Sequence, residues 1–369
     1  MATHIEHLEI NTYRGIKDLK IEDLGDVNII VGDNNTGKTS VLEAIQLLCA
    51  PNKYNLMQVA RQREKYRLAM GGTFLDSLKY LFEVKDDNHG SYELNVAGRI
   101  RGKNGYVRVT GEIETRLADL NFSVVGKNVP ETKTGEVDTF CGQIENGFCM
   151  GTNGQMHFFP DIEQFEINNY TRLRISQQKD ATILQSRAVL TVDHVLENAF
   201  SMLIRNKDIK DKVVELLRDQ FDSDIVDLRI VSEVSGGRYT PVVEVESGGY
   251  IPLSLYGDGM KKALTMLNAI VKTEDGVVLI DEFETALHTS AMEEVFSAVS
   301  ASARKMGVQL FMTTHSLEAV DKMLESAGEH IAKMRVIRLK KKNGKTYARV
   351  MNGQEALENR RNYDAELRV

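Results

Sequence analysis

The chain has 369 residues, of which 42% are apolar and 27% are charged, a balance that is typical of globular proteins and excludes wholesale disorder. Its formal net charge is −7, so no global positive field attracts it to nucleic acid, and any DNA contact must come from local basic clusters. No apolar run approaches the ~18 residues of a membrane span, and the start, MATHIEHLEI, lacks the pattern of a secretory signal. We therefore expect a cytoplasmic protein without a membrane partner, whose three cysteines are reduced thiols.

The first ninety residues predict short strands, a glycine-bounded loop and helices. Alternating and β-branched residues before position 32 predict two or three strands. The segment TSVLEAIQLLCA, residues 39–50, is apolar on nearly all sides, as expected for a buried helix. Residues 53–82 also have a helical pattern and contain a basic cluster, RQREKYR, at 61–67.

The middle of the chain has a different pattern. Residues 91–117 alternate between apolar and polar positions, with glycine and asparagine at the bends, which predicts an antiparallel meander. Residues 126–156 are rich in glycine, asparagine and threonine and predict long loops. Residues 185–222 have a helical pattern, and strands are expected again from residue 224.

The last part of the chain alternates helices with short apolar strands. Residues 260–272 predict an amphipathic helix, and the apolar stretches around 277–282 and 308–316 predict buried strands. The segment 335–353 predicts a basic hairpin that turns at Asn343-Gly344.

The loop before the first helix has the pattern of a phosphate-binding loop. Residues 32–39 read GDNNTGKT and match G-x-x-x-x-G-K-[ST] at every fixed position, with an apolar strand before them and a helix after. Glycines let backbone N–H groups turn toward phosphate oxygens, and the helix N-terminus adds partial positive charge. We expect Lys38 to reach the β- and γ-phosphates and Thr39 to hold Mg²⁺. The predicted ATP-binding residues of this loop are Asn34, Asn35, Thr36, Gly37, Lys38, Thr39 and Ser40.

Two later strands end in polar residues. The stretch VVLIDE, residues 277–282, ends in two carboxylates, and sheets of this class bind ligands at the carboxyl ends of their strands. We expect Asp281 to hold Mg²⁺ through water and Glu282 to act as the general base for the attacking water. The next strand, LFMTTHS at 310–316, brings His315 to a place where it could hydrogen-bond the γ-phosphate and that water. Each pattern alone is often structural, but their order after the phosphate loop favours catalysis.

A fourth motif precedes the strand that ends at Asp281. In LSLYGDGMKKAL, residues 253–264, two glycines open the amphipathic helix, and a helix start is a potential anion site. Its nearness in sequence to the Asp281 strand suggests that it contacts a phosphate in trans, in a second copy of the chain. An ordinary helix start is the alternative.

These four motifs, in this order, resemble those of ABC-type ATPases. Within that superfamily, GDNNTGKTSVLEAI is similar to the phosphate loop of OLD-type ATPases, the RecF/SMC-like branch with a paired asparagine. The stretch TYRGIKDLKI, residues 12–21, looks like the opening strands of that branch. IDEFETALH resembles its I-D-E-P-E-x-x-L-H, with Phe283 in place of the usual proline. The resemblance covers residues 1–50 and 250–320 well and the middle only in outline.

The resemblance implies an α/β fold, namely an ABC-type P-loop ATPase head with a mixed central sheet, an antiparallel β lobe and an inserted helical lobe. Together with the pattern of elements, it predicts that residues 1–369 form a single discontinuous ATPase. Residues 1–90 and 246–350 would form the nucleotide-binding core, and residues 91–245 the inserted β meander and helical lobe. The activity implied is slow hydrolysis of ATP to ADP and phosphate.

The family also implies a head-to-tail homodimer or higher oligomer that encloses two ATP molecules. Arg14 would lie near the nucleotide, and the signature segment would contact the γ-phosphate of the opposite protomer. A typical signature has a serine before the glycines, whereas Tyr256 holds that place here and Ser254 lies two residues earlier, so the contacting residue stays open. The predicted signature comprises Ser254, Tyr256, Gly257, Asp258 and Gly259.

A glutamine that senses Mg²⁺ is expected between the lobes of such an ATPase. Gln155, Gln177 and Gln178 are the candidates, and the sequence does not choose among them. Mg²⁺ itself is expected on Thr39 and Asp281.

The predicted role of the ATPase depends on the stretch of chain after the last motif. OLD proteins carry a Toprim nuclease domain after the ATPase, whereas 54 residues lie beyond His315 here. We therefore expect a sensor or scaffold of bacterial anti-phage defence that controls a separately encoded effector, such as a nuclease. The alternative is a RecF-like DNA-repair clamp that binds DNA through the hairpin 335–349 and the cluster 61–67, although such charge is more often simply solvated. A transporter ATPase is the third and weakest interpretation.

Overall fold

The computed structural model describes nearly all of the predicted core elements. The described residues are 3–62, 73–84, 91–122, 131–152, 155–171, 183–189, 205, 207–232 and 239–363. The chain divides into two compact units: unit 1 comprises residues 1–6, 21–42 and 184–369, and unit 2 comprises residues 7–20 and 43–183. These boundaries differ from the predicted division, because residues 43–90 group with the meander and residues 184–245 group with the phosphate loop.

A six-stranded sheet forms the centre of unit 1, in the order β16-β15-β3-β14-β13-β9. Its neighbours pair in parallel, apart from the antiparallel hairpin of β15 and β16, and this confirms the predicted mixed sheet. Val31 pairs with Thr314, and Ile280 pairs with Met312, so the carboxyl ends of three strands meet at one edge. The strands are β3 (Val27–Val31), β9 (Ser186–Val189), β13 (Val277–Ile280), β14 (Gln309–Thr314), β15 (Met334–Lys342) and β16 (Lys345–Asn352).

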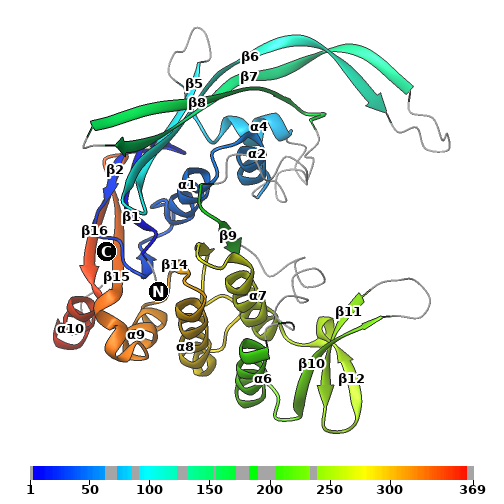
Figure 1. Ribbon diagram of the computed structural model, residues 1–369, viewed down its shortest axis with the longest axis vertical. Coiled ribbons are helices and arrows are strands. Elements are labelled where there is room, and N and C mark those ends of the chain that lie inside the picture. Colours follow the sequence, from blue (N-terminus) through cyan, green and yellow to red (C-terminus); the bar gives the residue numbers. More distant parts are fainter. Residues whose placement is uncertain are drawn as a thin grey trace. The chain divides into compact units, whose positions relative to one another are not determined.

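Helices pack against this sheet within unit 1 (Figure 1). On α8, apolar residues recur three and four positions apart, so one stripe of the helix enters the core; this stripe is Ala291, Val295, Phe296, Val299 and Ala303. The helices are α6 (Lys207–Gln220), α7 (Asp258–Thr273), α8 (Thr289–Lys305), α9 (Leu317–Glu325) and α10 (Gly353–Tyr363), with the short 3₁₀ helices η2 (Leu253–Leu255) and η3 (Gly328–Lys333). No helix among the described residues has the length and apolar character needed to cross a membrane.

Two smaller β elements complete unit 1. The strands β10 (Ile225–Ser232), β11 (Tyr239–Val245) and β12 (Gly249–Pro252) form an antiparallel sheet that leads into η2 and α7. The hairpin of β15 and β16 turns at Asn343 and Gly344, whose φ angles of 52° and 77° are those of a type I′ turn. The predicted basic hairpin is therefore confirmed.

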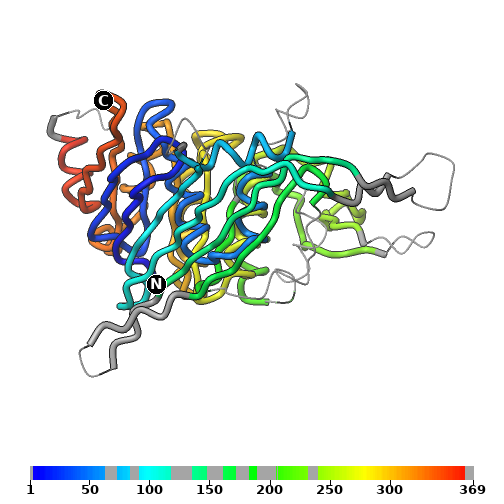
Figure 2. Tube along the Cα trace, turned by 90° about the horizontal axis from the view of Figure 1, so that it is seen from above, coloured from blue at the N-terminus to red at the C-terminus, as the bar shows by residue number. Residues whose placement is uncertain are grey.

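Unit 2 contains most of a seven-stranded antiparallel sheet with the path β2-β1-β5-β6-β7-β8, and β4 pairs with β5. Figure 2 shows the long strands of this sheet running side by side. α2 and α4 pack together, and α4 contacts β8. Three elements, β1, β2 and α1, cross the boundary between the units. The elements are β1 (Ile5–Tyr13), β2 (Ile16–Ile21), α1 (Lys38–Cys49), α2 (Lys53–Arg61), α4 (Phe74–Lys79), β4 (Glu83–Val84), β5 (Tyr92–Ile100), β6 (Lys103–Phe122), β7 (Glu131–Thr152) and β8 (Gln155–Asn168).

Two predicted elements were wrong. The predicted long loops at 126–156 are largely strand β7, which pairs with β6 and β8, because neighbouring strands bond its backbone despite its glycines. The predicted helix at 185–222 begins instead with strand β9, which pairs in parallel with β13, while α6 is helical as expected; residues 190–204 lie outside the described residues. Pairing with a strand about ninety positions later along the chain is a tertiary effect that a local pattern does not contain.

Candidate nucleotide site

The phosphate loop joins β3 to α1 and needs glycine at its start. A Cβ atom on Gly32 would lie 2.5 Å from the Leu339 carbonyl oxygen, and its φ of 152° is also unfavourable for other residues. Asn35 and Gly37 have φ angles of 64° and 99°, so the loop also turns through left-handed backbone conformations. The consensus glycines therefore have direct steric reasons here.

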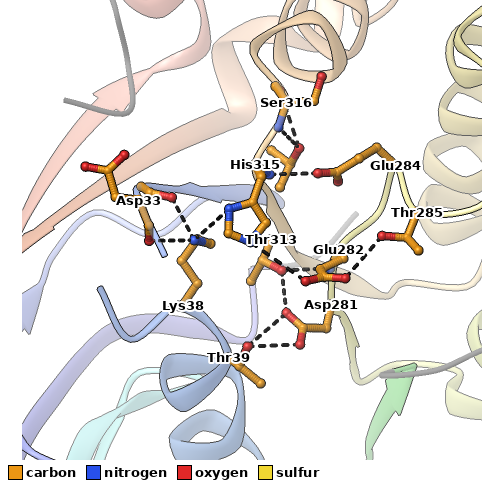
Figure 3. A network of polar contacts seen from close by, with 12 residues as sticks. Asp33, Lys38, Thr39, Asp281, Glu282, Glu284, Thr285, Thr313, His315 and Ser316 are labelled. Carbon is orange, nitrogen blue, oxygen red and sulfur yellow. Dashed lines mark hydrogen bonds and ion pairs between the residues drawn. The ribbon is translucent and has the colours of Figure 1, made fainter. Parts of the chain in front are cut away.

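Lys38 is the first residue of α1, and its side chain folds back over the loop (Figure 3). Its Nζ donates to the carbonyl oxygens of Gly32 at 2.7 Å and Asp33 at 2.9 Å, and it lies 3.2 Å from His315 Nδ1. Burial lowers the pKa of Lys38, while nearby carboxylates, Asp281 first, oppose that shift. The loop thus holds a positioned ammonium group at its centre.

Asp281 follows β13 and lies beside the first turn of α1. Thr39 Oγ1 donates to Asp281 Oδ2 at 3.0 Å, and Thr313 at the end of β14 donates to the other carboxylate oxygen. A hydroxyl and a carboxylate fit Mg²⁺, which takes few protein oxygens and completes its shell with phosphates and water. The described residues contain no group of three or more acidic, histidine or cysteine side chains suited to a metal, so Mg²⁺ would need the phosphates of ATP as further ligands.

Glu282 has an unusual backbone and an available side chain. Its φ of 47° is left-handed, which costs about 1–3 kcal/mol in a non-glycine residue and so needs support from its surroundings. The Glu282 N–H donates to Thr313 Oγ1 at 2.8 Å, and the Lys262 ammonium donates to the Glu282 carbonyl. The carboxylate itself is 52% exposed and lies 3.7 Å from His315 Nε2. The strain therefore holds a solvent-accessible carboxylate beside the histidine.

His315 links the loop lysine to Glu282. The Lys38 ammonium can only donate, so Nδ1 of His315 accepts and the ring proton lies on Nε2, toward Glu282. The backbone N–H of His315 donates to Glu284 Oε1 at 2.7 Å, which fixes the residue after β14. The structure thus brings together Lys38, Thr39, Asp281, Glu282 and His315.

Phe283 stands where the similar OLD-type pattern has proline, and its backbone N–H is used in a hydrogen bond. Its N–H donates to the Thr313 carbonyl at 3.0 Å, a bond that proline cannot make. Its ring is fully buried and packs edge-on against Phe296 at 6.0 Å between centroids. This residue therefore fastens the loop after β13 to β14 and to the core.

The remaining predicted loop residues differ in exposure. Asn34 and Asn35 are exposed at the tip, whereas Thr36 and Ser40 are buried. Thr36 Oγ1 donates to the Asp33 carbonyl at 2.8 Å and so closes the loop. The asparagine pair is thus accessible to a ligand, and its predicted contact with ATP stays a prediction.

The predicted signature segment surrounds the start of α7. Tyr256 donates through its hydroxyl to Asp222 Oδ2 at 3.2 Å, and burial together with Asp222 raises its pKa to about 12. Ser254, Gly257 and Asp258 are exposed, and Gly257 is the helix N-cap without a side-chain cap. Tyr256 is thus bound within its own chain, whereas Ser254 is accessible.

Gly259 brings the signature helix against the loop that follows β13. A Cβ atom at Gly259 would lie 2.7 Å from the Ala286 carbonyl, so only glycine allows this approach. The start of α7 and the loop that carries Glu282 are therefore in contact.

Arg14 lies in unit 2, at the turn between β1 and β2, with a φ of 48°. Its Nε is 2.8 Å from Glu43 Oε2, and the Tyr13 hydroxyl donates to the same carboxylate oxygen at 3.1 Å. All three side chains are buried or nearly so, and Glu43 belongs to α1. The ion pair gives Arg14 a structural partner, and its approach to the nucleotide stays a prediction.

The structure leaves the Mg²⁺-sensing glutamine open. Gln155 is the first residue of β8, while Gln177 and Gln178 lie outside the described residues.

Sequence reasoning missed three residues of the site: Lys262, Glu284 and Thr313. Thr313 touches Asp281 only because β13 and β14 pair in register, a relation that the sequence does not state. Glu284 contacts His315 across the same strand pair. The available signal for Lys262 was a lysine inside a helix that is apolar on most faces, which suggests a buried cation with acceptors nearby.

Lys262 leads to a prediction about pH. Burial lowers its pKa to about 8 from an ordinary value of 10.5, so between these values the unfolded chain binds a proton that the folded chain has released. The free energy of unfolding should therefore gain a contribution that rises from pH 8 toward 10.5. Urea denaturation of the wild type and Lys262→Met across this range should show a difference that grows with pH. If the free energies of unfolding of the two proteins run parallel across this pH range, the lowered pKa of Lys262 is contradicted.

The fold and this cluster define a P-loop ATPase, and comparisons with known proteins agree. The family model "AAA domain, putative AbiEii toxin, Type IV TA system" matches residues 167–321, and "AAA ATPase domain" matches residues 4–100. The chain is therefore an ATPase, as predicted.

Similar proteins include two curated relatives that align over most of the chain. An "ATP/GTP phosphatase" of Helicobacter pylori is 26% identical over 336 residues, covering 86% of both chains. A "DNA replication and repair protein RecF" of Nitrosococcus oceani is 22% identical, covering 84% of this chain and 92% of the relative. Among solved structures, the "SMC head domain from Thermotoga maritima" aligns with 95% of this chain and 100% of its own at 12% identity and a TM-score of 0.46.

Proposed function

We propose that this chain is an OLD-type ATPase that dimerises on ATP and acts as a sensor or scaffold for a separately encoded effector, such as a nuclease, in bacterial anti-phage defence. The observation that carries the proposal is the exposure of two predicted ATP-contacting groups. The Glu282 carboxylate is exposed, and in the same unit Ser254 of η2 and Gly257, the N-cap of α7, are exposed to solvent. A second copy would supply its signature segment to this nucleotide and receive ATP contacts in return.

The surface beside the signature supports association with a second copy. Leu255 is 74% exposed and Tyr250 is 53% exposed, and both lie within eight residues of the helix start at Asp258. Large apolar side chains that gather on a surface favour a protein partner. ATP between two such faces would join them through the phosphates, so dimerisation would depend on the nucleotide.

The residues of one site divide the work of hydrolysis. Lys38 would neutralise the β- and γ-phosphates, and Glu282 would accept the proton of water as its oxygen attacks the γ-phosphorus and the bond to ADP breaks. His315 would donate its Nε2 proton to a γ-phosphate oxygen or to the water. Thr39 and Asp281 would hold Mg²⁺, which supplies charge to stabilise the phosphates. The family model that matches residues 167–321 has a description that names a toxin and a toxin–antitoxin system, and this supports a role of the chain in such a system.

A DNA clamp is the second candidate, supported by the RecF relatives and by the β15–β16 hairpin. β15 pairs with β3 up to Val31, so the exposed Lys340, Lys341 and Lys342 extend past that strand beside the phosphate loop. Thr346 of β16 donates to the Thr36 carbonyl at 3.4 Å, which ties the hairpin to the loop. Nucleotide binding could thus alter a basic surface that suits a DNA backbone.

Purification from the native operon decides between the two candidates. The tagged chain would be isolated with Mg²⁺-ATP or with no nucleotide, and its associated proteins and DNA would be measured. For the effector role we expect a stoichiometric neighbour-encoded protein and loss of phage resistance when the gene is deleted. For the clamp we expect duplex DNA that is retained with ATP and released by salt.

Charge reversal of Lys340, Lys341 and Lys342 to glutamate is the matched control. It should leave effector capture unchanged and abolish DNA retention if the clamp is correct. A chain that assembles with no protein, and whose deletion leaves phage sensitivity unchanged, would contradict the effector proposal.

A further inference from the structure

A cavity in unit 1 lies at the opposite end of the sheet from the phosphate loop. It has a volume of about 290 Å³, near the lower limit of ~300–1,000 Å³ that is usual for small-molecule sites. Asp26 and Val27, at the start of β3, form part of its wall, whereas the phosphate loop comes after the end of that strand. Five strand residues span about 16 Å, so the cavity is separate from the nucleotide site.

The C-terminal half of α8 presents hydrogen-bond donors to this cavity. Ser297, Ser300 and Arg304 line it and are spaced three and four residues apart, so they share one face of the helix. Ser300 is only 5% exposed, and its hydroxyl has no hydrogen-bond partner. Within the described part of the chain, the Arg304 guanidinium has no carboxylate partner either. A buried donor without a partner is costly, so Ser300, beside the half-buried Arg304, indicates a ligand that supplies acceptors.

The acidic residues of the cavity are already engaged or point away. Asp26 accepts a hydrogen bond from the Thr3 hydroxyl at 2.7 Å and lies 4.0 Å from the Lys333 ammonium. The Glu329 side chain is 90% exposed and pairs with His330 at 3.7 Å. Asp26 and Glu329 thus have basic partners of their own, in Lys333 and His330, so Arg304 is the lining cation that has no carboxylate partner among the described residues.

Part of the wall is apolar. Val27, Phe296 and Met334 line the cavity and are each less than 5% exposed. Contact between such a surface and an apolar group is favourable because it removes apolar area from water. A guanidinium binds a planar or tetrahedral oxyanion through two parallel hydrogen bonds. The ligand therefore needs an oxyanion at one end and an apolar body at the other.

We propose that this cavity binds a small organic anion, a phosphate monoester or a carboxylate with an apolar body. Arg304 and Ser300 hold its oxyanion, and the wall around Phe296 holds its body. The site needs no contact with the phosphate loop, so its occupancy is independent of the ATPase proposal above.

Calorimetric titration of the full chain with phenyl phosphate, benzoate and inorganic phosphate tests the proposal. The nucleotide site is first saturated with Mg²⁺ and a non-hydrolysable ATP analogue, so that the phosphate loop cannot bind the probes. We expect saturable binding of phenyl phosphate or benzoate, the stronger of the two identifying the oxyanion, and weaker binding of inorganic phosphate. Arg304→Gln should weaken binding roughly tenfold or more, because a charged hydrogen-bond donor is lost.

Two further variants keep the test decisive. Lys305→Gln removes the same charge from the neighbouring residue, which pairs with Asp208, and should bind as the wild type does. Ser300→Ala removes a hydroxyl without a partner, so it should fold normally and still weaken binding severalfold. Absence of saturable binding by every probe, or equal affinity in the wild type, Arg304→Gln and Ser300→Ala, would overturn the proposal.

Discussion

Lys38→Ala should abolish ATP binding and with it hydrolysis. Lys38 is 6% exposed, and its ammonium is held inside the loop by the carbonyls of Gly32 and Asp33, where a phosphate would meet a desolvated positive charge. Each charge-assisted hydrogen bond is worth about 1.5–3 kcal/mol, so losing contacts to two phosphates should weaken binding by roughly 10² or more. Equilibrium titration with a fluorescent ATP analogue measures the loss.

The control must separate lost binding from lost folding. Lys103→Ala removes an exposed lysine from β6 in unit 2 and should leave ATP affinity unchanged. Thermal unfolding of both variants without nucleotide should show similar midpoints, because the Lys38 ammonium bonds, among the described residues, to loop carbonyls and to the nearby histidine. Unchanged ATP affinity in Lys38→Ala would refute the assignment of the loop.

Much of this cluster could be predicted because its chemistry is written in short, local patterns. The loop around Lys38, the carboxylates that end β13 and the histidine after β14 each come directly after an apolar strand, and parallel strands bring their ends together. The hairpin turn at Asn343-Gly344 was predictable for a similar reason, since the turn type depends on two adjacent residues.

The parts that escaped prediction depend on partners far away in the chain. Thr313 supports both Asp281 and Glu282 through pairing of β13 with β14. Lys262 supports Glu282 from α7, and its role comes from burial rather than from any motif. The strand at 186–189 and the long strand β7 are likewise fixed by their neighbours in a sheet, where context outweighs local preference.

Glu282→Gln should slow hydrolysis about 10²–10⁴-fold while ATP binding persists, because the amide keeps the shape but cannot accept a proton. The side chain is 52% exposed and its main contact is from the Thr285 hydroxyl at 3.2 Å, so the change should not disturb the fold. With Mg²⁺-ATP, the proposed dimer should then accumulate, since the step that releases it is blocked. Gel filtration with and without ATP, beside a phosphate-release assay, measures both effects.

Glu293→Gln is the matched control, since Glu293 is an exposed carboxylate on α8, eleven residues further along the chain. It should hydrolyse ATP as the wild type does and show no ATP-dependent shift in elution. Wild-type turnover in Glu282→Gln would remove Glu282 as the base and direct attention to His315, whose Nε2 lies 3.7 Å away. Slow turnover without a larger species would keep Glu282 as the base but contradict the ATP-dependent dimer. The two readouts therefore test the chemistry and the composite site separately.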